Sequence, residues 1–313
     1  MAYRHVSAML NETLANLNCK PGGIYVDCTL GGAGHAKAIC ERIAPNGRLV
    51  AIDQDADAIA NGRARLSSYG GGVTFFHGNF VDLPAYLAQL QIEAVDGILL
   101  DLGLSQNQIE SSGRGFTFQK DEPLDMRMDV RSETTAADLI NRLSESEMAR
   151  LFREYGEERW AKRIAGRIAA ARRVAPVRTT SELARLVISA VPAGAAARQK
   201  IHPATRIFMA LRIAVNRELE RLAQFLEESI DWLKRGGRLC VLSFHSLEDR
   251  MVKRHFKKMA HPCTCPPDLP RCSCGRQAMV RLITKRVLRP STREVAQNPM
   301  ARSTRLRCLE KVA

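Results

Sequence analysis

The sequence has no long apolar run. Its 313 residues contain no stretch of the roughly 20 apolar residues that a membrane-spanning helix needs. The first residues, MAYRHVSAMLNETL, have neither the apolar core nor the small-residue cleavage site of a secretory signal. These absences argue against membrane and secreted proteins, and we expect a cytoplasmic protein.

Acidic residues are fewer than basic ones. The chain has 47 Lys and Arg against 33 Asp and Glu, a formal charge of +14. Such an excess produces a positive field that attracts polyanions, most often nucleic acid. The alternative is a basic surface without a polyanionic partner. A hydrophobic content of 45% is ordinary for a globular protein with a core.

Strand patterns are missing from the middle of the chain. Between residues 113 and 203 only helical patterns occur, including two capping boxes, Ser144 with Glu147 and Thr179 with Glu182. Between these boxes, a four-residue spacing predicts one apolar helix face, made by Trp160, Ile164 and Ile168. We therefore expect an inserted all-helical domain over residues 113–203.

Short apolar runs separated by helical segments occupy the rest of the chain. Runs that are apolar on both faces are typical of parallel strands covered by helices. The fold class predicted is α/β, a doubly wound Rossmann-like sheet domain over residues 1–112 and 204–313, with one long helical region over 206–237. The strand candidates are GIYVD, RLVAID, VTFFHG, VDGILLDLG, RLCVLSFH, VRLITKRVL and TRLRCLEKV.

A glycine loop follows the first predicted strand, in VDCTLGGAGHA at residues 26–36. A strand, glycine loop and helix form a cradle for dinucleotides or for S-adenosylmethionine. Asp27 stands before the glycines, where a carboxylate suits a sulfonium cation and repels a pyrophosphate. The glycine spacing also departs from G-x-G-x-x-G. Both observations favour S-adenosylmethionine.

Three further residues stand at or just after the ends of the next strands. Asp53 is placed to bind ribose hydroxyls, Phe80 to lie against adenine, and Asp101 to stand beside the methyl donor. The carboxyl ends of parallel strands meet at one edge, so the set predicts one crevice. The alternative for each acid alone is a strand-end cap.

At this point the chain resembles a known family along nearly its whole length. This is the RsmH or MraW family of S-adenosylmethionine-dependent methyltransferases, which act on cytosine N4 of bacterial 16S rRNA. The motifs that carry the resemblance are HVSAMLNETL, DCTLGGAGHA, AIDQDADAI, DGILLDLGLS, RGFTFQKDEPLDMRMD, YGEERWAKRIA, HPATRIFMALRIAVN, GGRLCVLSFHSLEDRMVK and NPMARSTRLR.

The resemblance implies a class I methyltransferase sheet with a helical insert, and N4-methylation of a decoding-centre (P-site) cytidine in the small ribosomal subunit. The family usually has glycine where this chain has Ala33; alanine should serve if the contact there is made by the main chain. The donor contacts that the resemblance implies are Ala33, Gly34, His35, Asp53, Phe80, Asp101 and Gln108.

Methylation of cytosine N4 needs an acceptor that draws the amine lone pair out of conjugation and aligns it. Many amino-methyltransferases use a Pro-Pro-aromatic motif here, whereas this chain and its family have DLGLS. We expect Asp101 to accept from the amine or to orient it, with Ser105 or Asn107 as a second polar group. Asp101 contacting only the donor is the alternative.

The substrate candidates lie in the predicted insert. Phe116 and Phe118 are candidates to stack on an extruded cytidine, or are core residues instead. Arg163 and Arg167 are expected to hold phosphates, as are Arg172 and Arg173. A lone histidine is most often structural, so His202 and His245 are not assigned as bases.

Four cysteines form two C-x-C pairs in CTCPPDLPRCSC. Cys263, Cys265, Cys272 and Cys274 are either a structural tetrahedral zinc site or free thiols.

Two other functions remain open from the sequence. One is an NAD-dependent oxidoreductase; the other is an RNA-binding ribosome assembly factor that retains a donor pocket. The sequence also leaves open whether the protein is a monomer or a homodimer.

Overall fold

The computed structural model describes residues 7–196, 201–266 and 273–313, which form two compact units. One unit contains the residues up to Gly103 together with Leu219–Ala313, and the other contains Leu104–Glu218. The second unit is wider than the predicted insert of 113–203. It includes residues 204–216 because the apolar side chains of that helix, such as Ile207 and Phe208, are buried in the helical core.

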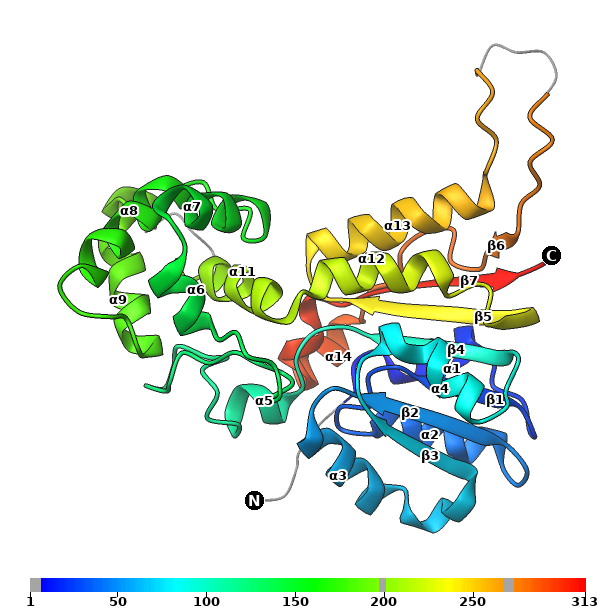
Figure 1. Cartoon of the computed structure of the whole chain (residues 1–313). Coiled ribbons are helices and arrows are strands. Elements are labelled where there is room, and N and C mark those ends of the chain that lie inside the picture. Colours follow the sequence, from blue (N-terminus) through cyan, green and yellow to red (C-terminus); the bar gives the residue numbers. More distant parts are fainter. Residues whose placement is uncertain (1–6, 197–200, 267–272) are drawn as a thin grey trace. The chain divides into compact units, whose positions relative to one another are not determined.

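The first unit is built on a seven-stranded sheet of order β3-β2-β1-β4-β5-β7-β6 (Figure 1). The five strands from β3 to β5 are parallel, whereas β7 runs antiparallel to both β5 and β6. The predicted doubly wound Rossmann-like class is confirmed. The strands are β1 Ile24–Asp27, β2 Arg48–Asp53, β3 Val73–His77, β4 Val95–Asp101, β5 Leu233–Ser243, β6 Val280–Leu282 and β7 Arg305–Lys311.

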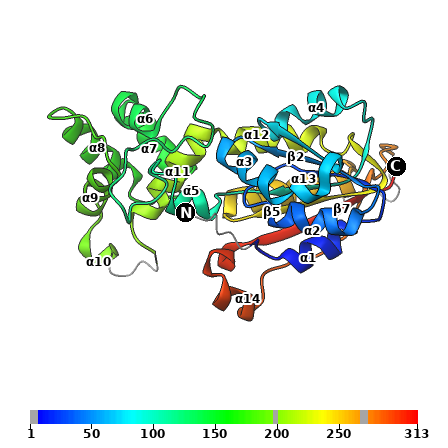
Figure 2. The ribbon, with the colours of Figure 1, turned by 90° about the horizontal axis from the view of Figure 1, so that it is seen from below.

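Helices cover both faces of this sheet (Figures 1 and 2). Two successive residues of β1, Tyr25 and Val26, lie in two different apolar cores and are at most 1% exposed, so both faces of the strand are buried. One core includes side chains of α4, α12 and α13, and the other includes side chains of α1, α2 and α3. These helices and a further one are α1 Leu10–Leu17, α2 Gly34–Ile43, α3 Ala56–Arg65, α4 Leu83–Gln89, α12 Glu218–Glu228, α13 Ser246–Ala260 and α14 Thr292–Gln297.

The second unit is helical, and its described residues contain no strand longer than an isolated bridge between Pro123 and Thr179. The capping boxes predicted at Ser144 and Thr179 are present. Ile164 and Ile168 are fully buried in its core, as the spacing predicts. The helices are α5 Gln106–Glu110, α6 Ala136–Arg142, α7 Glu145–Glu154, α8 Ala161–Arg172, α9 Thr180–Ala190, α10 Ala193–Ala196 and α11 Ala204–Asn216.

The long helical region predicted over 206–237 is wrong in two places. Arg217 adopts a left-handed conformation (φ 51°) and separates α11 from α12. The Asn216 side chain accepts from the Met128 N–H and donates to the Met126 carbonyl, each at 2.8 Å, which holds the end of α11 within the helical unit. Strand β5 then begins at Leu233, before the Gly-Gly pair.

Among the described residues, no helix combines the length and the apolar character needed to cross a bilayer.

Candidate functional site

Three carboxylates stand at the carboxyl ends of neighbouring strands. Asp27 ends β1, Asp53 ends β2 and Asp101 ends β4, and β1 lies between the other two in the sheet. Parallel strands end at the same edge, so the three side chains share the edge where ligands of open α/β sheets bind. The sequence prediction that these acids meet is consistent with this topology.

The glycine loop between β1 and α2 is fixed by hydrogen bonds to this edge. The Gly31 N–H donates to Asp53 Oδ2 at 2.8 Å, and Arg65 donates to the Gly32 carbonyl at 2.5 Å. Ala33, with φ 58°, is the residue before α2 and is fully buried. The main chain of the loop is therefore held by two side chains, those of Asp53 and Arg65. Because the Gly31 N–H is already bonded, it is not available to a pyrophosphate.

His35 and Asp101 form a buried pair. His35 is the second residue of α2, and its Nδ1 lies 3.3 Å from Asp101 Oδ2. Thr29 links the ends of β1 and β4. Its hydroxyl accepts from the Asp101 N–H at 2.6 Å, and its N–H donates to Asp27 Oδ1 at 3.1 Å. Thr29 and Arg65 were missed by the sequence analysis. Thr29 occupies the loop itself, two residues after Asp27, which is the one local signal that pointed to it.

Two polar atoms at this edge are buried and have no hydrogen-bond partner among the described residues. They are Asp27 Oδ2 and Asp101 Oδ1. A buried polar atom without a partner is costly, so native proteins retain such atoms mainly where a ligand or water satisfies them. The edge is therefore prepared to accept a polar ligand.

Burial shifts the titration of this cluster. It raises the pKa of Asp27 to about 6, against the opposing effect of His35, and the pKa of Asp53 to about 7, against the N–H donors of Asp55 and Gly31. Burial also opposes charge on His35, but its hydrogen bond with Asp101 and the charge of that carboxylate prevail and raise its pKa. Perturbed groups clustered at a strand edge are typical of functional sites.

Comparison with known proteins shows the family of the chain. A family model described as the MraW methylase family matches residues 2–312. The chain belongs to the MraW methylase family. It is 57% identical over 312 residues to the protein named ribosomal RNA small subunit methyltransferase H in Desulfosudis oleivorans, with 100% of each chain covered. The proteins of the same name in Desulforapulum autotrophicum and Lachnospira eligens are 52% and 47% identical, and the alignments cover 100% of this chain and 100% and 99% of theirs.

The strand edge fits the methyl donor expected for a MraW methylase. Asp53 accepts one backbone N–H at each oxygen, which leaves a lone pair on each for a ribose hydroxyl. Asp27 and Asp101 each offer a carboxylate oxygen without a hydrogen-bond partner, and their place beside a sulfonium stays a prediction. Phe80 is only 8% exposed and packs edge-to-face on Phe225, with ring centroids 5.3 Å apart. Its contact with adenine stays a prediction.

Ser105, Asn107 and Gln108 lie in the helical unit at the start of α5. The Ser105 hydroxyl accepts from the Gln108 N–H at 3.2 Å, and the Gln108 side-chain oxygen accepts from the Ser105 N–H at 2.9 Å. This capping box explains why α5 begins here. The catalytic and donor-binding roles of the three residues stay predictions.

The two phenylalanines are both engaged in packing within the helical unit. Phe116 is 8% exposed in its core. Phe118 is partly buried; its ring stacks on His202 at a centroid distance of 4.6 Å and meets Phe208 edge-to-face at 5.1 Å. These contacts agree with the alternative that both belong to the core, and stacking on cytidine stays a prediction.

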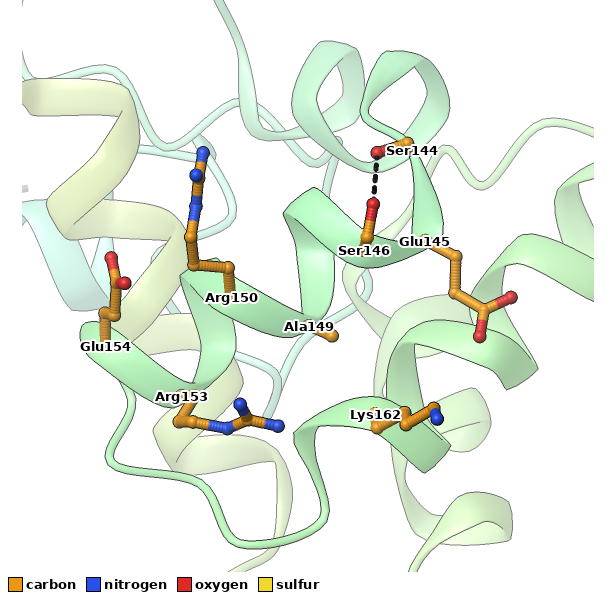
Figure 3. Close-up of a pocket in the computed structure, with 8 residues that line it drawn as sticks. All are labelled: Ser144, Glu145, Ser146, Ala149, Arg150, Arg153, Glu154 and Lys162. Atoms are coloured by element: carbon orange, nitrogen blue, oxygen red, sulfur yellow. Dashed lines mark hydrogen bonds between the residues drawn. The ribbon is translucent and has the colours of Figure 1, made fainter.

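Basic side chains gather on α7 and α8. Arg163 and Arg167 are exposed, and Arg167 donates to the Ser189 hydroxyl at 3.2 Å. Arg172 is half-buried and donates to the Ile140 carbonyl at 2.6 Å, so it supports the fold. A hollow of about 790 Å³ lies between α7 and α8. Figure 3 shows the side chains that line it, which are Ser144, Glu145, Ser146, Ala149, Arg150, Arg153, Glu154 and Lys162.

A second hollow adjoins the first because both are lined by Glu145 and Lys162. It adds Arg159, Trp160 and Arg163. The two hollows form one basic surface, defined by Arg150, Arg153, Arg159, Lys162 and Arg163.

Three of the four clustered cysteines converge. The Sγ atoms of Cys263, Cys265 and Cys274 all lie within 4.8 Å of one another, and Cys272 is outside the described residues. His245 precedes α13 and accepts from the Glu248 N–H at 3.4 Å, which is a structural use.

Proposed function

We propose that this protein transfers a methyl group from S-adenosylmethionine to the exocyclic N4 of a cytidine in the decoding centre (P site) of 16S rRNA. The observation that carries the proposal is the unsatisfied Asp101 Oδ1, buried at the end of β4 beside His35 and the glycine loop. This oxygen is a hydrogen-bond acceptor, and the reaction needs an acceptor that holds the N–H group of the cytosine amine.

The chain's own groups supply the alignment that the reaction needs. Asp53 binds the ribose of the donor, and Asp27 places negative charge near the sulfonium. Asp101 accepts a hydrogen bond from the cytosine amine, which localises the lone pair on N4 and directs it toward the methyl carbon. His35 and Thr29 hold Asp101 in this orientation through its side chain and its N–H.

The donor supplies an electrophilic methyl group when bound. As N4 forms its bond to the methyl carbon, the carbon–sulfur bond breaks and the electron pair stays on sulfur, leaving a neutral thioether. The methylated amine then loses one proton, to water or to a carboxylate of the edge. Asp27 and Asp101 are the candidates, because each has a buried carboxylate oxygen without a hydrogen-bond partner.

The basic surface on α7 and α8 is proposed to hold the RNA backbone, together with Arg167. The lining of the two hollows carries five Arg and Lys against two acidic residues, Glu145 and Glu154. Neither Lys162 nor Arg163 forms an ion pair with another described residue. Such solvated cations bind phosphates by counterion release, without sequence preference.

Nucleoside mass spectrometry of small-subunit RNA, from cells with and without the gene, tests the proposal. N4-methylcytidine should disappear at one position in the deletion strain and return when the wild-type gene is restored. An unchanged N4-methylcytidine content would reject the reaction. If the modification returns with an Asp101→Ala variant, the role of Asp101 is wrong.

The same complementation separates the enzyme from an assembly factor. An assembly factor restores normal subunit profiles even when Asp101 is replaced, whereas an enzyme loses the modification. We propose a cytoplasmic enzyme. Sedimentation of the purified protein tests the homodimer that the sequence leaves open.

A further inference from the structure

The segment between α13 and β6 has no apolar core of its own. Its described parts, 261–266 and 273–279, contain neither helix nor strand, and none of their side chains is buried. Figure 1 shows the two parts as a pair of arms that leave α13 and return to β6. Burial of apolar surface therefore does not explain why these arms come together.

Sulfur atoms meet where the arms come together. Cys263 and Cys265 are on the first arm and Cys274 is on the second, and their Sγ atoms lie within 4.8 Å of one another. Thiolates on a tetrahedral zinc ion, with zinc–sulfur bonds of about 2.3 Å, are roughly 3.8 Å apart. The three sulfur atoms are thus close to the positions that one ion requires.

A backbone donor points at one of these sulfurs. The Ser273 N–H lies 3.4 Å from Cys265 Sγ, and the Ser273 hydroxyl lies 3.8 Å from the same atom. Hydrogen bonds from outside the first coordination shell orient metal ligands and stabilise thiolate charge. The contact also crosses between the two arms.

We infer that Cys263, Cys265 and Cys274 bind a structural zinc ion through their thiolates. Zinc is the expected metal because three soft sulfur ligands select it over magnesium or calcium. Binding replaces three S–H bonds by three zinc–sulfur bonds and releases three protons, with no change of oxidation state.

The ion is structural rather than catalytic because of its place in the sheet unit. Helix α13 starts at Ser246, three residues after β5 ends at Ser243 on the carboxyl edge. Its 15 residues rise about 1.5 Å each, so Ala260 lies about 22 Å along the helix from that edge. The cysteines follow Ala260, on the side of the sheet away from Asp101.

Metal analysis of protein purified without chelators tests the inference. We expect about one equivalent of zinc per chain, and less than about one tenth of that in the variant with Cys263, Cys265 and Cys274 all changed to serine. Cobalt added to the metal-free wild type should give thiolate-to-cobalt charge-transfer absorption that the triple variant lacks. Cys19→Ser, at a half-buried cysteine outside the cluster, is the matched control and keeps the metal.

Limited trypsin digestion reports the structural role. Removing zinc should speed cleavage after the exposed Arg276, while the affinity for S-adenosylmethionine changes by less than about twofold, because the ion is far from the strand edge. Zinc-free wild type without cobalt absorption, or a disulfide among these cysteines under non-reducing mass spectrometry, overturns the inference. Neither outcome bears on the proposed methylation, so the two failures are distinguishable.

Discussion

The strand edge of the sheet unit and the basic surface of the helical unit use charge in opposite ways. At the edge, Asp27 and His35 are 1% and 4% exposed; burial raises the pKa of Asp27, whereas the pKa of His35 is raised by Asp101 against the effect of burial. On α8, the side chains of Lys162 and Arg163 are exposed to solvent. Buried charges act over short distances in fixed geometry, whereas solvated charges act additively and are screened by salt.

This difference predicts two kinds of mutational response. Single substitutions at the edge should cause large losses that depend on one atom. Substitutions on the basic surface should cause small losses that depend on net charge and ionic strength. The following predictions test that contrast.

Asp101→Asn should have the largest effect. The change keeps the shape of the side chain but removes its negative charge and replaces one acceptor oxygen by an amide NH2 donor, so the rate of methyl transfer should fall by about 10²–10⁴-fold. The measurement is single-turnover methylation of small subunits from the deletion strain. Asp96→Asn is the control, because Asp96 is on the same strand near its other end and pairs with Lys234. A similar loss in both variants would contradict a specific role.

Asp53→Ala should weaken donor binding by about 10²-fold or more. Two hydrogen bonds to a charged acceptor are lost, at about 1.5–3 kcal/mol each. Calorimetry measures the affinity for S-adenosylmethionine, and filter binding should show unchanged RNA affinity. The exposed Asp57 on α3 supplies the control Asp57→Ala. If Asp53→Ala binds the donor normally, ribose recognition lies elsewhere.

The strand edge was predictable from the sequence to a greater extent than the basic surface. Asp27, Asp53 and Asp101 each end an apolar run, which is a local pattern, and parallel pairing then brings them together. Thr29 was not predictable as a link, because its hydroxyl meets the N–H of Asp101, 72 residues away. Such contacts depend on tertiary packing.

In the helical unit, too, local features were predictable from the sequence and features that depend on tertiary contacts were not. Capping boxes are local, so the starts of α7 and α9 were predicted. The helix break at Arg217 was not, because helix-forming residues continue through it and the interruption follows from Asn216 bonding to Met126 and Met128. Arg172 was grouped with the phosphate binders, and only the structure shows that it bonds to the main chain.

The double change Arg163→Glu and Arg167→Glu should weaken RNA binding by about tenfold at low salt. If two phosphate contacts are lost, the slope of log affinity against log salt should become shallower by about 1.4. Arg131→Glu with Arg142→Glu is the control of equal charge, at exposed arginines paired with Asp129 and Asp138. Equal losses in both double variants would mean that net charge alone matters, and the basic surface would not be a defined site.

Donor binding should strengthen with pH. Burial raises the pKa of Asp53 to about 7, and ribose hydroxyl donors favour its charged form, so binding lowers this pKa and releases a proton. Affinity should rise by at most about tenfold per pH unit up to about pH 7 and then level off. Calorimetry in buffers of different ionisation enthalpy measures the proton release. An affinity that falls across this range would contradict the assignment.

The raised pKa of Asp53 has the opposite effect on the stability of the donor-free protein, which should fall as pH rises. Between about pH 4 and 7 the folded state keeps a proton on Asp53 that the unfolded state has released, so its contribution to stability is lost as pH rises.

The smallest effect is expected at Ala33, where the backbone rather than the side chain determines the site. Its φ of 58° costs an alanine about 1–2 kcal/mol, which Ala33→Gly relieves. The same change loses a buried methyl group, about 0.8 kcal/mol, and adds about 0.5–1 kcal/mol of chain entropy to the unfolded state. The free energy of unfolding and the donor affinity should therefore both stay nearly unchanged. Urea unfolding measures the free energy of unfolding, and calorimetry measures the donor affinity. Ala33→Val adds a branched side chain at positive φ in a fully buried position, so it should lower both quantities. A large loss of donor affinity in the glycine variant would show that the Ala33 methyl group itself contacts the donor. The glycine loop would then bind through a side chain, as Asp53 is proposed to do, and not through its backbone alone.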